Sequence, residues 1–344
     1  MSKLNVGVLG ATGMVGQRFI EGLRDHPYFE LAALAASKRS AGKTYKEAAK
    51  WYIEGDIPEE YADVEVALAE PGIIEEYGLD LVFSATPSAI AKELEASFAE
   101  KIPVYSNTKT YRMEDDVPLM IGDVNPHHLD LLEKQREERG WRGGIVTNPN
   151  CSTIGVVLPL KPLFDEYGIE WADIVTYQAV SGAGYDGVSS MSIMGNIIPY
   201  IGGEEEKIEK ETMKILGEPG QPASFQATAT CARVPVIDGH LECATLKLGK
   251  DFTEGDIKQL FSSYKSLPHE LGVPTCAEPA MVVMEEPDRP QPRLDSYVGG
   301  GMAVTVGRIQ RKLPKVLRFF CLSHNTIRGR SEEHTSELQS LLII

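Results

Sequence analysis

The sequence predicts an α/β protein with a Rossmann-type doubly wound parallel sheet and a second domain of mixed α+β structure. Strand-like and helical patterns alternate through the N-terminal part of the chain. A glycine-rich turn follows the first strand-like run. After the cysteine at position 151, the strand-like runs lengthen and are separated by proline-rich and acidic stretches.

The N-terminal elements alternate in the order expected of a parallel sheet. We expect strands at 4–10, 30–37, 79–86 and 102–108, with a loop and helix at 10–26 and a helix at 88–101. A helical crossover between strands returns the chain in the same direction, which predicts parallel pairing. Longer strands are expected in the second domain at 172–182, 240–249 and 302–310.

The composition favours a small-molecule ligand. The chain has 344 residues and a formal net charge of -16, which opposes binding to nucleic acid because phosphates attract clustered Lys and Arg. We see no signal peptide and no apolar run long enough for a membrane span. Five cysteines without a C-x-x-C pair argue against a disulfide framework and a zinc site, and predict a cytoplasmic protein without a bound metal.

The glycines of GATGMVG have the context of a dinucleotide-binding loop. Gly10, Gly13 and Gly16 follow the first strand and begin a helix, so backbone N–H groups can approach a pyrophosphate. The spacing G-x-x-G-x-x-G differs from the commoner G-x-G-x-x-G, and an ordinary tight turn is the alternative. The context nevertheless favours a nicotinamide cofactor.

The end of the second strand predicts which cofactor binds. An NAD enzyme normally has an acidic residue there for the ribose 2′-hydroxyl. This chain has Ser37, Lys38, Arg39 and Ser40 instead. A basic, hydroxyl-rich turn suits a 2′-phosphate and predicts NADP, although a solvated loop has the same composition.

Cys151 lies in TNPNCST, after a rigid turn and before residues that can begin a helix. The positive end of a helix dipole lowers the pKa of a thiol and makes it nucleophilic. A small buried hydrophobe is the alternative. A catalytic thiolate also needs a base, and His240 is the mildly favoured histidine because a glycine turn precedes it.

Seven motifs in order resemble aspartate-semialdehyde dehydrogenases of the archaeal and fungal type. They are GATGMVG, SNTKTYRM, NPNCST, YQAVSGAG, GEEEKIEKE, RVPVIDGH and SHNTIRG, and the match covers about residues 3–329. The resemblance implies an NADP-dependent oxidoreductase that interconverts 4-phospho-L-aspartate and L-aspartate 4-semialdehyde through a cysteine thioester. This reaction leads toward lysine, threonine and methionine.

The same resemblance assigns site residues. Cys151 would be the nucleophile, His240 the general acid/base, and Gln178 the residue that orients the substrate near the sulfur. The substrate would be bound through its carboxylate by Arg233, through its ammonium by Glu204, and through its phosphate by Lys207, Arg112 and Asn150. Cofactor contacts would come from Gly10, Thr12, Gly13, Met14, Val15, Gly16, Ser37, Arg39, Ser40, Ser84, Ser181, Gly182 and Asn325.

The resemblance also implies a domain organisation and an assembly. Residues 1–150 would form the NADP-binding domain and 151–324 the catalytic and dimerisation domain, of the semialdehyde dehydrogenase type, in a homodimer or homotetramer. Residues 325–344 would form a C-terminal return segment, where the family has an Ala/Gly-rich helix. From Arg330 the chain reads RSEEHTSELQSLLII, which resembles a translated sequencing adapter. We expect this string to be an artefact, with a divergent natural tail as the alternative.

Two other functions remain compatible with the sequence. An NADPH-dependent malonyl-CoA reductase would keep Cys151 and His240 without needing an ammonium site. A non-catalytic NADP-binding protein is the second, because the chain has an altered terminus. Glu204 and Arg233 favour the amino-acid substrate, and the full set of catalytic residue types favours an enzyme.

Overall fold

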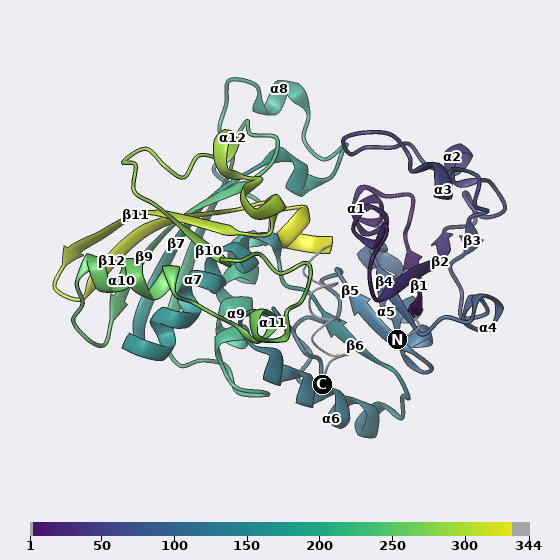
Figure 1. The fold of residues 1–344 in the computed structure, drawn as a ribbon, viewed down its shortest axis with the longest axis horizontal. Coiled ribbons are helices and arrows are strands. Elements are labelled where there is room, and N and C mark those ends of the chain that lie inside the picture. The colour runs from purple at the N-terminus through teal and green to yellow at the C-terminus, as the bar shows by residue number, and fades with distance from the viewer. Residues whose placement is uncertain (1–2, 332–344) are drawn as a thin grey trace. The chain divides into compact units, whose positions relative to one another are not determined.

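The computed structural model describes residues 3–331, which divide into two compact units (Figure 1). Within the described part, the first unit runs to Met120 and resumes over His127–Asn148. The second unit takes Ile121–Pro126 and the chain from Pro149 onward. The short segment Ile121–Pro126 lies inside the predicted N-terminal domain, yet it belongs to the second unit.

The first unit contains a six-stranded parallel sheet in the order β3-β2-β1-β4-β5-β6. Its two halves extend in opposite directions from β1 and β4, which confirms the doubly wound prediction. All four residues of β4 are buried, as expected of a strand covered on both faces. The strands are β1 (Leu4–Leu9), β2 (Phe29–Ala36), β3 (Ala67–Leu68), β4 (Leu81–Ser84), β5 (Pro103–Ser106) and β6 (Gly144–Thr147).

Helices connect these strands. Helix α1 contacts β1 and β2, and α5 contacts β5 and β6. The apolar side of α1 buries Phe19, Ile20 and Leu23 against the sheet. The helices are α1 (Met14–Leu23), α2 (Tyr45–Ala48), α3 (Glu59–Ala62), α4 (Ile73–Tyr77), α5 (Ser88–Ala99), η1 (Pro126–Asp130) and α6 (Leu131–Arg139).

The second unit contains a six-stranded mixed sheet in the order β10-β11-β12-β9-β7-β8. The outer pairs β10–β11 and β7–β8 are parallel, whereas the three central pairings are antiparallel. This arrangement confirms the predicted α+β domain. The strands are β7 (Ile169–Gln178), β8 (Gln226–Arg233), β9 (His240–Leu248), β10 (Met281–Met284), β11 (Val304–Leu313) and β12 (Val316–Ser323).

Helix α7 is the central helix of this unit. It contacts β7, β9, β11 and β12 as well as α9, and its side chains are buried from Cys151 through Leu160. Its first residue, Cys151, is therefore buried inside the domain. The helical elements of the unit are α7 (Cys151–Tyr167), η2 (Val180–Ala183), α8 (Ser190–Ile193), α9 (Glu204–Leu216), α10 (Glu254–Ser262), α11 (Leu267–Leu271), α12 (Pro292–Asp295), η3 (Val298–Gly301) and η4 (Ile327–Ser331).

Two further sequence expectations concern membrane-spanning helices and the C-terminus. Among the described residues, none of the helices combines the length and apolar character needed to cross a bilayer. The altered terminus predicted from Arg330 lies almost wholly outside the described residues, as does most of the predicted return segment 325–344.

Candidate active site

Cys151 and His240 form a close thiol–imidazole pair in the second unit. The Cys151 Sγ atom lies 3.2 Å from the Nε2 atom of His240. Cys151 is the first residue of α7, and His240 is the first residue of β9. Cys151 is 5% exposed and His240 is fully buried. The N-terminus of α7 and the imidazole both favour negative charge on the sulfur, so the pair can provide a nucleophilic thiolate.

The backbone of Ala179 determines which ring nitrogen of His240 carries the proton. The Ala179 N–H donates to His240 Nδ1 at 3.1 Å. Because Nδ1 accepts this hydrogen bond, the neutral ring carries its proton on Nε2, the nitrogen that faces Cys151. His240 therefore presents an N–H donor to the sulfur.

Asn150 caps the helix that carries Cys151. Its side-chain oxygen accepts a hydrogen bond from the Ser152 N–H at 2.9 Å. Its own backbone N–H donates to Glu211 at 2.6 Å, and its side-chain Nδ2 donates to Glu204 at 2.6 Å. These contacts hold the turn before Cys151 and bring an acidic group of α9 next to it.

Glu204 is a buried carboxylate with several partners. Lys207 lies 2.8 Å away, one turn further along α9. Burial opposes ionisation, but the Lys207 ammonium and hydrogen bonds from Asn150 and Gln178 outweigh it and lower the pKa of Glu204. Gln178 also donates to Thr176 at 3.3 Å from the end of β7. The structure thus brings Gln178, Glu204, Lys207 and Asn150 together.

Arg233 is held next to the Cys151–His240 pair by the same backbone segment that orients the histidine. Its Nη1 atom donates to the Ala179 carbonyl at 2.7 Å. A Cβ added at Gly182 would lie 3.0 Å from Arg233 Nη1 and 3.0 Å from His240 Cε1. A side chain at this position would press on both residues, so the glycine lets the loop after β7 pass close to them.

The segment after β12 completes the surroundings of Cys151. Asn325 accepts a hydrogen bond from the Gly239 N–H at 2.8 Å and donates to the Ser181 hydroxyl at 2.8 Å. It therefore holds the turn that leads into His240. A Cβ at Gly329 would lie 2.9 Å from the Cβ of Cys151, so this position also needs a glycine.

The first unit carries a cavity of ≈ 940 Å³ at the carboxyl ends of β1 and β2. Ser37, Lys38 and Arg39 line it on one side. Gly10, Thr12 and Gly13 line it where the chain leaves β1. Gly13 is the N-cap of α1, whose first-turn N–H groups, including those of Met14 and Val15, point out of the helix. Anions bind at such a helix N-terminus.

Two glycines of the loop act through close packing. A Cβ at Gly10 would lie 2.6 Å from the Ala85 carbonyl oxygen, and one at Gly16 would lie 2.3 Å from the Gly10 carbonyl oxygen. Gly10 also has a φ of +82°, which favours glycine. Gly16 therefore allows α1 to pack on the loop, and it does not line the cavity.

The lining of this cavity does not include every residue expected to contact the cofactor. Met14, Val15, Gly16, Ser40 and Ser84 are not among the residues that line the cavity. Ser84 is buried and donates to Glu95 at 2.7 Å. Ser40 is buried within the turn that Ser37 begins.

Four other expected contacts divide between the two units. Arg112 belongs to the first unit, where it donates to the Asn107 carbonyl at 3.0 Å. Ser181, Gly182 and Asn325 belong to the second unit, which does not carry the cavity.

Sequence reasoning missed two contributors to this site. Ala179 acts through its backbone N–H and carbonyl, and the residue type does not indicate such contacts. Glu211 accepts a hydrogen bond from the Asn150 N–H. It is the last residue of the GEEEKIEKE motif, seven positions after Glu204, and the motif alone assigns it no role. Two turns of α9 separate these glutamates, a spacing that places both on one helix face.

Comparisons with known proteins agree with this geometry. Residues 5–132 match the family described as "Semialdehyde dehydrogenase, NAD binding domain", and residues 160–328 match "Semialdehyde dehydrogenase, dimerisation domain". The chain is 51% identical over 332 residues to the aspartate-semialdehyde dehydrogenase of Methanothermobacter thermautotrophicus, covering 95% of each chain. It is 46% identical over 341 residues to the Schizosaccharomyces pombe enzyme, covering 96% of this chain and 95% of the relative.

A solved structure is also similar over the whole chain. The crystal structure of aspartate-semialdehyde dehydrogenase with NADP from Candida albicans superposes with a TM-score of 0.91 at 42% identity, covering 100% of both chains. The two matched families together span most of this chain, and the identities extend over nearly its full length. The chain belongs to the aspartate-semialdehyde dehydrogenase family.

Proposed function

We propose that this protein catalyses the reversible conversion of 4-phospho-L-aspartate and NADPH to L-aspartate 4-semialdehyde, phosphate and NADP. The chain is an oxidoreductase of the aspartate-semialdehyde dehydrogenase family, whose biosynthetic reaction leads toward lysine, threonine and methionine. The observation that carries the proposal is the 3.2 Å contact between Cys151 Sγ and His240 Nε2 at the start of α7. A thiolate there can form the covalent intermediate that acyl-group reduction needs.

Cys151 begins the proposed chemistry. Its thiolate attacks the carbonyl carbon of the acyl phosphate, an S–C bond forms, the C–O bond to the phosphate breaks, and phosphate leaves with the electron pair. The N–H of His240 Nε2 donates to the thiolate before attack. The product of this half-reaction is an aspartyl thioester on Cys151.

His240 then stabilises the oxyanion of the second half-reaction. NADPH, when bound, would supply the hydride that reduces the thioester carbonyl. The N–H of His240 Nε2 donates to the developing oxyanion and keeps its proton while the carbonyl reforms and the C–S bond breaks. The Ala179 N–H occupies Nδ1, so the neutral ring has no second proton to give and acts through Nε2 alone.

Charge matching supports the amino-acid substrate. Arg233 offers a planar guanidinium for the substrate α-carboxylate, and Glu204 is an ionised carboxylate suited to the α-ammonium. Gln178 contacts Glu204 and would orient the substrate close to the sulfur. Lys207, Asn150 and Arg112 remain the proposed phosphate ligands, although Asn150 also caps α7.

The cavity in the first unit fits a dinucleotide with a 2′-phosphate. A Cβ at Gly13, the N-cap of α1, would contact only the Gly10 carbonyl oxygen, at 3.6 Å. The helix N-terminus at this position suits a pyrophosphate. Lys38 and Arg39 line the same cavity and would face the 2′-phosphate, with the Ser37 hydroxyl as an additional donor. These residues support NADP as the cofactor.

A steady-state assay separates this function from malonyl-CoA reduction. With L-aspartate 4-semialdehyde, NADP and phosphate, we expect NADPH formation that depends on all three. With malonyl-CoA and NADPH, we expect no oxidation of the cofactor. The reverse pattern would establish the reductase, and inactivity in both assays with retained NADP binding would establish a non-catalytic protein.

Two further properties follow from the family. Part of the chain matches a dimerisation domain, which supports an oligomer. We infer a homodimer or homotetramer, which sedimentation would distinguish. The five cysteines form no disulfide, which supports a cytoplasmic location.

A further inference from the structure

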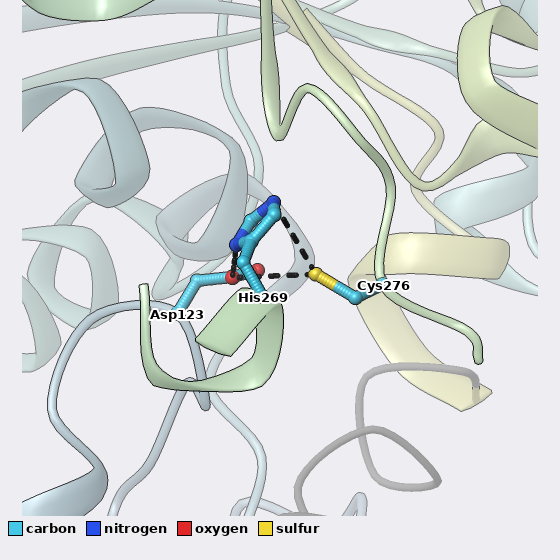
Figure 2. Close-up of side chains that lie close together, drawn as sticks. All are labelled: Asp123, His269 and Cys276. Carbon is cyan, nitrogen blue, oxygen red and sulfur yellow. Dashed lines mark hydrogen bonds and ion pairs between the residues drawn. The ribbon is translucent and has the colours of Figure 1, made fainter. Parts of the chain in front are cut away.

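A second cysteine–histidine–aspartate cluster lies in the second unit, formed by Cys276, His269 and Asp123 (Figure 2). Cys276 Sγ lies 3.4 Å from His269 Nε2, and His269 Nδ1 lies 3.7 Å from Asp123 Oδ1. Cys276 follows α11, which carries His269, and Asp123 comes from the segment Ile121–Pro126. In Figure 2 dashed lines join the imidazole to the carboxylate and to the sulfur, and a third line joins Cys276 Sγ directly to Asp123 Oδ1, 3.9 Å away. None of the three residues belongs to the proposed active site.

The contacts of His269 orient its two ring nitrogens toward different partners. The Ser266 N–H donates to Nδ1 at 3.3 Å, and the Ser266 hydroxyl lies 2.6 Å from the same atom. Nε2 lies 2.9 Å from the carbonyl oxygen of Ala277, which can only accept. The neutral ring therefore carries its proton on Nε2, where it also faces Cys276.

Asp123 is held as a carboxylate. Arg328 and the Ser266 hydroxyl both donate to its oxygens. Burial opposes ionisation, but the Arg328 guanidinium and the Ser266 hydrogen bond outweigh it and lower the pKa of Asp123. The Tyr264 hydroxyl bonds to the backbone of Asp123 rather than to its carboxylate.

This arrangement suits thiol activation better than metal binding. The three ligand atoms lie within 4.8 Å of one another, a spacing compatible with a metal ion. A metal would have to take one ring nitrogen from Ala277 or Ser266, and it would share Asp123 with the Arg328 cation. In the existing geometry the Nε2–H group can instead donate to a Cys276 thiolate at 3.4 Å, and the Asp123 carboxylate, 3.9 Å from the same sulfur, is the charged group that opposes it.

We propose that Cys276, with His269 and Asp123, forms a second reactive-thiolate site that hydroperoxides oxidise to a sulfenic acid. The thiolate attacks one peroxide oxygen, an S–O bond forms and the O–O bond breaks. The leaving oxygen takes the electron pair and a proton from solvent, which gives water when the oxidant is hydrogen peroxide. Sulfur is oxidised by two electrons and the peroxide is reduced by two. Cys276 is half-buried, so a small peroxide can reach it.

Cys243 provides an internal control in the same chain. It is also half-buried, and burial raises the pKa of its thiol. We would treat the full chain with hydrogen peroxide, trap sulfenic acid with dimedone, and follow the Cys276 and Cys243 peptides separately by mass spectrometry. The Cys151 peptide is resolved from both. At pH 6 we expect Cys276 to be trapped faster than Cys243.

His269→Asn tests the role of the imidazole. Asparagine can keep an acceptor near the position of Nδ1, which receives the Ser266 N–H, but it lacks Nε2. Imidazole pairing increases the thiolate fraction and slightly lowers its nucleophilicity, so we expect the variant to slow Cys276 trapping about fivefold at pH 6. At pH 9 the difference between the variant and the parent should vanish or invert, because the Cys276 thiol is then largely ionised in both proteins. At each pH, the Cys243 rate should be the same in the variant and the parent.

Three outcomes would overturn the proposal. Equal trapping of Cys276 and Cys243 at pH 6 would show that the cluster does not activate the thiol. A slowing of the same size at every pH in His269→Asn would show that the imidazole affects only access to the sulfur. Trapping of Cys276 that requires prior treatment with EDTA would identify the cluster as a metal site. Loss of the Cys276 adduct in Cys276→Ser verifies the peptide assignment.

Discussion

The backbone N–H of Ala179 donates to Nδ1 of His240, and this contact fixes the side of the imidazole that carries the proton. The opposite nitrogen, Nε2, lies 3.2 Å from the sulfur of Cys151. Ala179 also accepts a hydrogen bond from Arg233 through its carbonyl. One peptide segment after β7 therefore positions His240, which donates through Nε2, and Arg233, which is proposed to bind the substrate carboxylate. The proposed chemistry and the proposed substrate binding therefore depend on the same loop.

His240→Asn separates these two effects of the histidine. The asparagine oxygen can accept the Ala179 N–H, which preserves the loop, but the side chain has no group at the position of Nε2. We expect kcat to fall by roughly 100- to 10,000-fold, the usual contribution of a general acid/base, with unchanged affinity for NADP. The control is His127→Asn, at an exposed histidine of the first unit. A kcat within a few-fold of the parent would exclude His240 Nε2 as the donor to the oxyanion.

Arg39→Ala tests the choice of cofactor. Arg39 lines the cavity of the first unit, and a charged hydrogen bond to a 2′-phosphate contributes about 1.5–3 kcal/mol. We therefore expect NADP affinity to fall by roughly 10- to 150-fold, while NAD affinity is unchanged. Titration of the fluorescence of the reduced cofactors measures both. Lys43→Ala, at an exposed cation that does not line the cavity, is the control. An equal loss for the two cofactors would contradict recognition of the 2′-phosphate.

Arg233→Lys tests carboxylate recognition. Lysine keeps the positive charge but cannot form a two-pronged contact, so we expect KM for the semialdehyde to rise by an amount corresponding to roughly 1.5–3 kcal/mol. The value of kcat should change less. Arg318→Lys is the matched control, at a position on β12 that contacts Thr245. If KM for the semialdehyde were the same in Arg233→Lys and the parent, Arg233 would not bind the substrate carboxylate.

The buried Glu242 should make the free energy of unfolding depend on pH. It is fully buried on β9, and burial raises the pKa of its carboxyl well above the usual value of 4.5. Cys321 lies 3.6 Å from it, and burial raises the pKa of that thiol as well. The folded state therefore keeps a proton on Glu242 that the unfolded state releases above pH 4.5. The resulting contribution to the free energy of unfolding is present below that pH and is lost as pH rises.

Glu242→Gln replaces the protonated carboxyl with a neutral group of similar shape. Relative to the parent, its free energy of unfolding should improve by up to about 1.4 kcal/mol per pH unit above pH 4.5, until the folded carboxyl ionises. Urea denaturation at pH 5, 6 and 7 measures the difference. A difference that stays constant across this range would mean that Glu242 is ionised in the folded protein.

Much of the fold was predictable because its signals are local. The alternation of apolar runs with helical patterns predicted the parallel sheet, and the glycine turn predicted the loop at the start of α1. Cys151 was predictable as a helix N-terminal residue because Asn150 is a good N-cap. These inferences need only neighbouring residues.

The rest depends on contacts between distant parts of the chain. Asp123, His269 and Cys276 are separated by 146 and 7 positions, and no spacing rule relates them. Ser84 is a cofactor contact by family resemblance alone, and its hydrogen bond to Glu95, a buried residue of α5, joins positions that no sequence pattern relates. The role of Ala179 lies in its backbone, where residue type carries no information.

The most direct test of the central claim is a pre-steady-state measurement of NADPH formation without phosphate. The full chain is mixed with L-aspartate 4-semialdehyde and NADP, and absorbance at the NADPH band is followed before and after phosphate is added. If Cys151 forms a thioester, a burst no larger than one NADPH per chain should precede phosphate, and turnover should begin only when phosphate releases the acyl group. Cys151→Ala should bind NADP normally and give neither phase, whereas Cys243→Ser should give both. Continuous turnover without phosphate, or a burst in Cys151→Ala, would contradict covalent catalysis by this cysteine.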